Sequence, residues 1–286
     1  MNSEIIKING LRLRVCTWGK RDRSPLILVH GWLDTGASFD FFARHLKDQF
    51  FLIAPDLRGY GQSEHTPSPL GYFFFEYVAD LHQIIQTYSP ESPVRLLGHS
   101  LGGAVASVYA GTYPDRISHL VNVEGFGFQR KDLKSPPQRA REWLGGLPPK
   151  EFPVHPDLET FAKRLQDSYP RLPSERVQFL AQQLALPVKG GYQNAADPKH
   201  RLIEPYPVPV ENFYAFWEET TAKSLFILAQ NSELAKYFEA GQFKQEMQDR
   251  QKFFPSGCQL ETLSNCGHMV HHEKPEELAQ LVGKFL

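Results

Sequence analysis

Residues 94–103 read VRLLGHSLGG, a mostly apolar run that leads directly into a match to the G-x-S-x-G pattern of a nucleophile elbow. In such an elbow a serine lies at the tip of a sharp turn between a strand and a helix, with a strained backbone and an exposed hydroxyl. Gly98 and Gly102 leave empty the space that side chains beside the turn would fill. The small residues from Ala104 onward are typical of the helix that should follow. This context predicts that Ser100 is a nucleophile rather than part of a tight glycine loop.

The C-terminal segment offers a base, which a serine hydroxyl needs because it is a poor nucleophile at neutral pH. A strand is expected near residues 259–263, and a helix should begin near Pro275, followed by two glutamates that favour a helix start. The loop between them carries His268, directly after a glycine that allows a tight turn. Its position after the last strand predicts His268 as the general base for Ser100.

A zinc site is the alternative for this histidine-rich loop, with His268, His271 and His272 as ligands. No H-E-x-x-H pattern and no carboxylate at ligand spacing accompany these residues, so the sequence does not support it. We therefore expect no metal, and we interpret His271 and His272 as packing or surface residues. No organic cofactor is expected either, because acyl transfer by serine and histidine needs none.

A second glycine-containing loop follows the apolar run of residues 26–29 and reads His-Gly-Trp. A serine nucleophile in this layout needs two backbone N–H groups that stabilise the oxyanion of the reaction. One belongs to the residue after the nucleophile, Leu101. The other comes from an early strand-to-helix loop, where Gly31 allows the backbone to approach closely, and we predict Trp32.

Four motifs occur in the order and spacing found in the α/β-hydrolase superfamily: HGW at 30–32, DLRGYGQS at 56–63, GHSLGG at 98–103 and GH at 267–268. The chain resembles that superfamily over residues 5–125 and 222–286, and within it the serine hydrolase-like branch near the haloalkane dehalogenases and epoxide hydrolases. Those relatives carry aspartate where this chain has Ser100, so the resemblance does not extend to alkyl-enzyme chemistry on halides or epoxides. The motif at 56–63 lacks a complete dinucleotide or phosphate-loop pattern, and we expect it to be structural.

The order of the expected elements favours an α/β fold. Strands are expected near residues 5–8, 11–17, 26–29, 50–54, 94–98, 119–124, 224–229 and 259–263. Stretches with apolar residues at three- and four-residue intervals lie between them, which predicts a mostly parallel eight-stranded sheet with helices on both faces. Asn9 and Gly10, between the first two strands, are a hairpin signal. This is the α/β-hydrolase fold that the resemblance implies, with residues 1–125 and 222–286 as its core domain.

Residues 126–221 differ in character and should form a helical cap, or lid, inserted after the sixth strand. Prolines divide the segment into short amphipathic stretches near residues 138–144, 158–168, 174–184 and 210–219. A lid over Ser100 would exclude water and shape the pocket. Most of its aromatic residues should pack the lid onto the core. The residues that we expect to line an apolar pocket are Trp32, His99, Phe126, Trp217 and Met269.

The resemblance also implies a carboxylate that holds the histidine, and two glutamates fit. The usual position in the superfamily follows the strand near 224–229, where Glu233 is the only carboxylate within reach. A second solution places the carboxylate after the strand that follows the elbow helix, where Glu124 comes directly after an apolar run. A glutamate there is costly to bury without a partner, so we favour Glu124. The alternatives are a solvated Glu233 that opens a helix, and a buried pair of Glu124 with an arginine of the cap.

The composition restricts the partners and the location of the protein. A length of 286 residues accommodates one α/β domain with an insertion, and the net charge of −1 argues against a nucleic-acid or anionic-membrane partner. Cys16, Cys258 and Cys266 are few and odd in number, which is typical of a reducing cytosol. The first residues contain no signal-peptide core, and no apolar run is long enough to span a membrane. We expect a cytoplasmic monomer or homodimer whose partner is a small ester-like molecule.

These residues together predict a serine hydrolase of the carboxylesterase type. It would cleave a small-to-medium apolar carboxylic ester, lactone or thioester through an acyl-enzyme on Ser100. Two alternatives remain open. The same residues would serve a carbon–carbon bond hydrolase, and the vacant aspartate position is compatible with a hydrolase-fold sensor that binds a ligand with little turnover.

Overall fold

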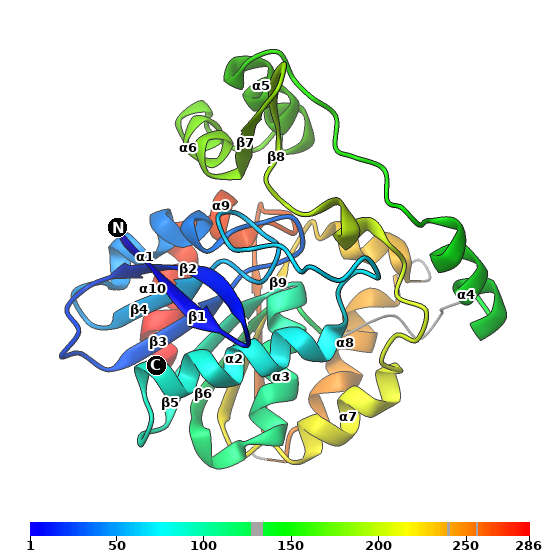
Figure 1. Ribbon diagram of the computed structural model, residues 1–286. Helices are drawn as coiled ribbons and strands as arrows, with labels where there is room; N and C mark the ends of the chain where they lie inside the picture. The colour runs from blue at the N-terminus through cyan, green and yellow to red at the C-terminus, as the bar shows by residue number, and fades with distance from the viewer. Residues whose placement is uncertain (127–133, 239–240, 256) are drawn as a thin grey trace.

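The computed structural model describes residues 1–126, 134–238, 241–255 and 257–286. Within these ranges eight strands form one sheet in the order β1-β2-β4-β3-β5-β6-β9-β10 (Figure 1). The strands are β1 (Asn2–Ile8), β2 (Leu11–Trp18), β3 (Pro25–Val29), β4 (Phe51–Pro55), β5 (Val94–His99), β6 (Ile117–Val123), β9 (Lys223–Ala229) and β10 (Cys258–Leu263). Only β2 runs antiparallel to its neighbours, β1 and β4. The predicted mostly parallel eight-stranded sheet is therefore confirmed.

The hairpin between β1 and β2 forms where the sequence predicts it. Asn9 and Gly10 have φ angles of 48° and 87°, the left-handed conformations that a two-residue hairpin turn requires. The two strands pair in register from Ile8 with Leu11 outward. This hairpin supplies the antiparallel edge of the sheet.

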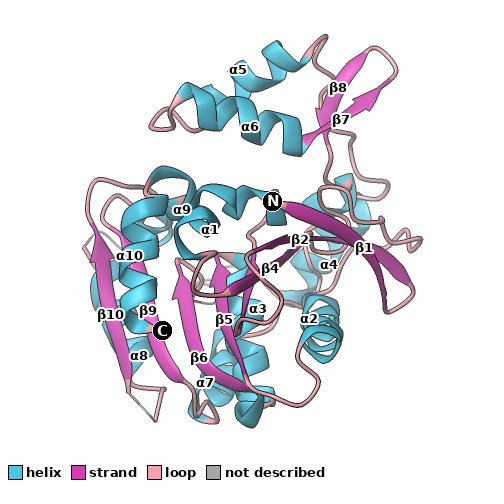
Figure 2. Cartoon of the chain, turned by 90° about the vertical axis from the view of Figure 1, so that its left-hand side faces the viewer, coloured by secondary structure: helices cyan, strands magenta, loops and turns pink. Residues whose placement is uncertain are grey.

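Helices cover both faces of the sheet because successive strand residues point to opposite sides and both sets are apolar. In β3, Ile27 and Val29 belong to the apolar core on one face, and Leu26 and Leu28 belong to the core on the other. The first core includes α2 (Phe74–Tyr88), α3 (Leu101–Thr112), α7 (Val210–Glu218) and α8 (Phe243–Gln251). The second includes α1 (Asp40–Leu46), α9 (Val270–Glu273) and α10 (Pro275–Phe285) (Figure 2).

The chain leaves the sheet after β6 and forms a separate body, the cap, which we define as the described residues 134–209. It holds α4 (Pro136–Gly145), α5 (Leu158–Ser168), α6 (Ser174–Leu184) and an antiparallel hairpin of β7 (Ala185–Val188) and β8 (Gly191–Asn194). Figure 1 shows α5, α6 and the hairpin standing together beyond one edge of the sheet, with α4 apart from them. Residues of α5 and α6 share a small apolar core of their own, centred on Phe161, Val177 and Leu180.

Two features differ from the predicted helical cap of residues 126–221. The hairpin of β7 and β8 is not helical, and its turn uses Gly190 and Gly191, both with positive φ. Helix α7 packs against α3 in the core of the sheet, where Phe213 and Trp217 are fully buried. An aromatic stripe at helical spacing fits a core helix as well as a lid helix, so the sequence did not separate the two.

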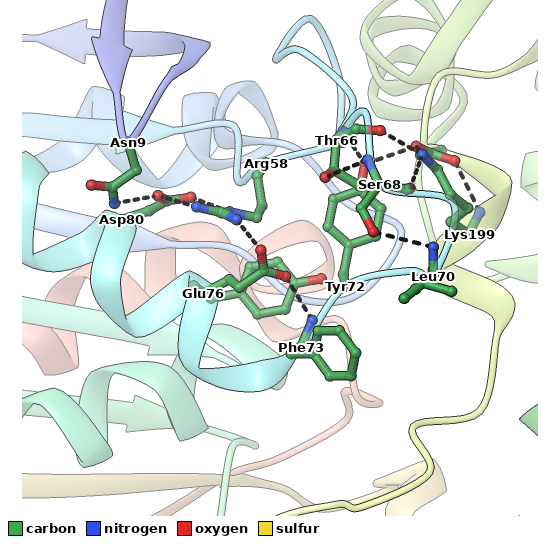
Figure 3. Close-up of polar contacts among 12 residues, drawn as sticks. Asn9, Arg58, Thr66, Ser68, Leu70, Tyr72, Phe73, Glu76, Asp80 and Lys199 are labelled. Carbon is green, nitrogen blue, oxygen red and sulfur yellow. Dashed lines mark hydrogen bonds and ion pairs between the residues drawn. The ribbon is translucent and has the colours of Figure 1, made fainter. Parts of the chain in front are cut away.

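The loop that follows β4 is held by buried ion pairs, in agreement with the structural role predicted for residues 56–63. Arg14 Nε lies 2.7 Å from Asp56 Oδ2, and both side chains are buried. Arg58 is paired with Asp80 and Glu76 of α2, at 2.6 and 2.5 Å (Figure 3). Buried charges need partners of this kind, so the loop is fixed on the sheet and on α2.

The same loop, in its continuation to Tyr72, anchors the last part of the cap. Lys199 Nζ donates to the carbonyls of Thr66 and Ser68, at 2.5 and 2.9 Å (Figure 3). The Tyr72 hydroxyl donates to Asp197 Oδ2 at 2.8 Å. Among the described residues, no helix is both long enough and apolar enough to cross a membrane.

Candidate active site

Ser100 lies at the elbow between β5 and α3, with φ 53° and ψ −119°, a strained conformation for a residue with a side chain. A Cβ atom on Gly98 would lie 2.2 Å from the carbonyl oxygen of Gly102. A Cβ atom on Gly102 would lie 2.1 Å from the carbonyl oxygen of Val29. Only glycine fits at either position, so the elbow has the close backbone packing that the sequence predicts.

His268 and Glu124 complete a hydrogen-bonded line with Ser100. His268 Nε2 lies 3.0 Å from Ser100 Oγ, and His268 Nδ1 lies 3.1 Å from Glu124 Oε2. The three residues follow β5, β6 and β10, whose carboxyl ends meet at one edge of the parallel sheet. A carboxylate accepts hydrogen bonds, so the imidazole hydrogen belongs on Nδ1 and Nε2 is left to accept the serine proton.

The carboxylate of Glu124 is buried and has several donors. The backbone N–H of Ala229 donates to Oε1 at 2.8 Å, and the hydroxyl of Ser232 donates to Oε2. The φ angle of Glu124 is 55°, and its own N–H donates to the carbonyl of Ile227 at 3.0 Å. In these contacts the partners of Glu124 are β9, the residues just after it and the imidazole. They differ from the alternative expected from the sequence, which is an arginine of the cap.

Glu233, the alternative acid, contacts the backbone of the histidine instead of its ring. It opens the short helix η4 (Glu233–Tyr237), and its Oε2 accepts the His268 N–H at 2.7 Å. Its Oε1 accepts from Arg171 Nη2 of the cap at 2.7 Å. Partial burial would raise the pKa of Glu233, but these donors lower it below its usual value. The geometry therefore distinguishes the two glutamates that the sequence left open.

His99 supports the histidine from the sheet. Its Nε2 lies 2.8 Å from the carbonyl oxygen of His268, so Nε2 carries the hydrogen that it donates. Burial, with the neighbouring His271 and His268, holds the pKa of His99 well below its usual value. His99 is thus a neutral residue that fixes the loop of His268.

Two chambers meet at Ser100, and their lining residues were only partly predicted. The first encloses about 310 Å³ and is lined by Trp32, Ser100, Leu101, Ala104, Glu124, Gly125, Phe126, Leu234, Tyr237, Phe238, Phe243 and Met247. The second encloses about 520 Å³ and is lined by Trp32, His99, Ser100, Asp167, Ser168, Tyr169, Pro170, Arg171, Glu233, His268, Met269 and Glu273. The first is mostly apolar, whereas the second carries several charged residues of the cap and of the His268 loop.

Four of the five predicted pocket residues line these chambers, and Trp217 does not. Its indole is fully buried in the core, 6.1 Å from Phe226 and 5.4 Å from Phe254 between ring centroids. Sequence reasoning missed the apolar residues of 234–247 and the cap residues of 167–171. The apolar residues of the first set are irregularly spaced in the sequence. The second set lines the chamber only because of the way the cap packs against the sheet domain. Neither set could therefore be recognised from the local sequence.

The loop after β3, which holds Trp32, one of the two predicted oxyanion residues, approaches the serine closely. A Cβ atom on Gly31 would lie 3.0 Å from Ser100 Cβ, so the glycine allows this approach. His30 fixes the loop, because its Nε2 accepts the Leu57 N–H at 2.9 Å and its Nδ1–H donates to the carbonyl of Gly31 at 2.7 Å. Trp32 and Leu101 both line the first chamber beside Ser100.

The zinc set considered from the sequence is not brought together, because His268 faces Ser100 and Glu124. His271 and His272 lie instead beside Asp34, with their Nε2 atoms 3.0 and 3.3 Å from Asp34 Oδ2. All three are buried, and within the described residues they are the group whose ligand atoms lie close enough to hold a metal ion. Ser38 Oγ also donates to Asp34 Oδ2, at 3.0 Å. The cluster packs under the His268 loop as a buried polar network.

Comparison with known proteins places these features in a family. The family described as "alpha/beta hydrolase fold" matches residues 24–275. A Drosophila melanogaster protein named "Probable serine hydrolase" is 32% identical over 153 residues, which are 53% of this chain and 44% of that protein. Human monoacylglycerol lipase ABHD6 is 30% identical over 285 residues, which are 94% of this chain and 77% of that protein. The thioesterase domain from the curacin biosynthetic pathway superposes with a TM-score of 0.85 at 23% identity, over 99% of both chains, and shares the fold.

Proposed function

Because this chain belongs to the alpha/beta hydrolase fold family and is a hydrolase of that family, we propose that it cleaves a carboxylic ester through an acyl-enzyme on Ser100. The observation that supports this most strongly is the line from Ser100 Oγ to His268 to Glu124, with distances of 3.0 and 3.1 Å. Serine, imidazole and carboxylate in this geometry form the arrangement that activates a hydroxyl for attack on a carbonyl carbon.

The proposed reaction has two steps. Ser100 Oγ attacks the ester carbonyl while His268 Nε2 takes its proton, and Glu124 holds the imidazole and stabilises its positive charge. The N–H groups of Trp32 and Leu101 donate to the oxyanion, where each donor is typically worth about 3 kcal/mol. The alkoxide then leaves with the proton from His268. Water, deprotonated by the same histidine, attacks the acyl-enzyme and releases the acid and the free serine.

The two chambers orient the substrate in this proposal. The leaving oxygen must take its proton from His268 Nε2, so the alcohol part occupies the second chamber, which His268 lines. The acyl part then enters the first chamber, whose walls are mostly apolar. Its volume of about 310 Å³ suits a medium-length acyl group. Asp167 and Arg171 favour a polar alcohol, and the name of the relative ABHD6 refers to such an ester, a monoacylglycerol.

The deciding experiment follows hydrolysis of p-nitrophenyl esters of increasing acyl length past many enzyme equivalents. We expect sustained turnover that rises from acetate to a medium-chain ester, and a loss of at least about a thousandfold in Ser100→Ala. Ser92→Ala, which changes an exposed serine before the amino end of β5, at the opposite end of that strand from Ser100, is the control. Release of one equivalent followed by a stall would contradict the proposal and favour the ligand sensor.

A second variant tests the orientation of the substrate. Leu234 is partly exposed and lines only the first of the two chambers, so Leu234→Trp should fill that chamber. We expect the preferred acyl length to shorten, while the relative rates for esters of one acid with different alcohols stay the same. A change in alcohol preference with no change in acyl preference would show that the assignment of the chambers is reversed.

A further inference from the structure

We propose that Arg171 of the cap is a positioning residue for His268. The reactive arrangement of the histidine then depends on the packing of the cap against the sheet domain. The proposal rests on the proposed function, in which His268 is the general base. Arg171 lies in the turn between α5 and α6, far from His268 in the sequence. Its guanidinium reaches out of the cap to Glu233 of η4 and Glu273 of α9, on either side of the His268 loop.

Arg171 joins two carboxylates of the sheet domain. Nη2 lies 2.7 Å from Glu233 Oε1 and 3.2 Å from Glu273 Oε1, and Nε lies 2.6 Å from Glu273 Oε2. The pair with Glu273 is bidentate, a geometry that the planar fork of arginine forms and that the single ammonium of lysine does not. One cap side chain therefore holds two acidic side chains that come from different elements.

Those carboxylates hold the backbone on which the imidazole is mounted. Glu233 Oε2 accepts the N–H of His268 at 2.7 Å, and Glu273 Oε2 accepts the N–H of Gly267 at 2.9 Å. A Cβ atom on Gly267 would lie 1.7 Å from Arg171 Nη2, so the guanidinium packs directly on this backbone. Two consecutive N–H groups are thus fixed by carboxylates that Arg171 itself orients.

The charges explain why the cap is needed for this arrangement. Glu233 and Glu273 accept from adjacent backbone amides, so two negative charges converge on one short segment, and like charges repel. The guanidinium between them offsets that repulsion. If the cap moves away, both carboxylates lose their shared cation, and the N–H groups of the His268 loop lose their fixed acceptors.

Arg176 of α6 provides a matched control. Its Nη1 also ties the cap to the same region, donating to the carbonyls of His272 and Glu273 at 2.8 and 3.1 Å. It touches neither carboxylate side chain that holds the His268 loop in these contacts. Loss of Arg176 should therefore loosen the cap without disturbing the link from Arg171 to the histidine.

The test compares Arg171→Gln, Arg171→Lys and Arg176→Gln. We expect Arg171→Gln to lower kcat by roughly tenfold to a hundredfold with a smaller change in KM, because a small misplacement of the base slows the chemical step. Arg171→Lys should recover part of the loss. Arg176→Gln should keep kcat close to the wild-type value even if its melting temperature falls.

The pH profile supplies a readout that loss of packing alone would not move. The ionisable groups that face His268 are Glu124 and His99 at the sheet edge, Glu233, Glu273 and His271 beside its loop, and Asp167 and Arg171 from the cap. Removing the Arg171 cation leaves more net negative charge around His268, which favours the protonated imidazolium form of the histidine. The acidic limb of kcat/KM should therefore move to higher pH in Arg171→Gln and stay in place in Arg176→Gln.

Some results would overturn the proposal. They are an unchanged kcat and acidic limb in Arg171→Gln, an effect confined to KM, or an equal loss in Arg176→Gln. Proton NMR of the hydrogen-bonded Nδ1–H of His268 separates this proposal from the proposed function, because it needs no substrate. The resonance should weaken or shift in Arg171→Gln and persist in Arg176→Gln. If the resonance is the same in both variants, the positioning role is refuted. That conclusion would hold even if esters are not the substrate.

Discussion

Glu124 has a strained backbone conformation and a buried carboxylate. Its positive φ angle and the N–H bond to Ile227 aim the side chain over the ends of β6 and β9. There the carboxylate accepts from Ala229 and Ser232 while it faces the imidazole. Burying the carboxylate without hydrogen-bond donors would cost several kcal/mol. The donors from β9 and the residues just after it offset part of that cost, so an acid can lie beside the histidine.

The first prediction concerns this residue. Glu124→Gln should lower kcat by about a hundredfold to ten-thousandfold with the fold retained, because a neutral amide cannot stabilise the imidazolium and disturbs its tautomer. Glu233→Gln should cost less, since Glu233 accepts from the backbone of His268 and not from its ring. Steady-state rates, with circular dichroism to check folding, measure both. A larger loss in Glu233→Gln than in Glu124→Gln would contradict the assignment.

At the scale of elements, the nucleophile elbow depends on close contact between α3 and the strands beneath it. Glycines at the start of α3 allow backbone to lie against backbone at β3 and β5. A Cβ atom on Gly125 would likewise lie 2.5 Å from the carbonyl oxygen of Ser100. The position of Ser100 is therefore coupled to the loops after β3 and β6, which carry Gly31 and Glu124.

The second prediction tests that coupling with two glycines. In Gly102→Ala the new methyl would meet the carbonyl of Val29 at 2.1 Å, so α3 must shift, and we expect a loss of about 2–3 kcal/mol in stability together with loss of activity. Gly145→Ala lies at the end of α4 with nothing within 4 Å of the new atom, and should be neutral or stabilise by up to about 1 kcal/mol. Chemical denaturation measures both changes, and equal stabilities would argue against a tight elbow.

Across the whole molecule, several histidines are buried in the neutral form. Burial is the main cause that lowers the pKa of His271 to about 4 and that of His200 to about 3. The pKa values of His30 and His99 are also lowered by burial. His99 and His271 lie against each other, and His30 and His200 both lie against Tyr60. Two parts of the fold therefore carry groups that the unfolded chain protonates more readily.

The third prediction follows from the sign of these shifts. Below the unfolded pKa of about 6.5 the unfolded chain binds protons that the folded chain refuses, so stability should fall as the pH drops, by at most about 1.4 kcal/mol per pH unit for each histidine. The loss should extend down to about pH 4 for His271. The pKa of Asp34 is lowered by His272 and His271 despite the opposing effect of burial, so Asp34 affects stability only at still lower pH.

Guanidinium unfolding at several pH values between neutral and mildly acidic measures this profile. Stability should be nearly flat between about pH 7 and pH 8, below the range in which thiols of the unfolded chain ionise. His200→Gln should reduce the slope on the acidic side, whereas His45→Gln, at an exposed position, should leave it unchanged. A flat profile through the acidic range would contradict the neutral burial of these side chains.

The sequence by itself determined the features that depend on residues close along the chain. Asn9 and Gly10 carry the left-handed turn of their hairpin, and the glycines around Ser100 specify the elbow, because local sterics decide both. The alternation of apolar strands and amphipathic helices likewise predicts the sheet and most of its helices. The prediction of His268 as the base likewise depends on its place after the last strand, which strand order brings to the edge that holds Ser100.

Only the tertiary structure decided which side chains meet across long distances in the sequence. Glu124 and Glu233 follow neighbouring parallel strands, and packing alone turns one toward the imidazole and the other toward its backbone. Trp217 has the aromatic spacing of a lid residue but lies in the core, and Arg171 reaches the His268 loop through the seating of the cap. Periodicity encodes which face of an element is apolar, but not which partner covers that face, because the partner is chosen by the packing of the whole chain.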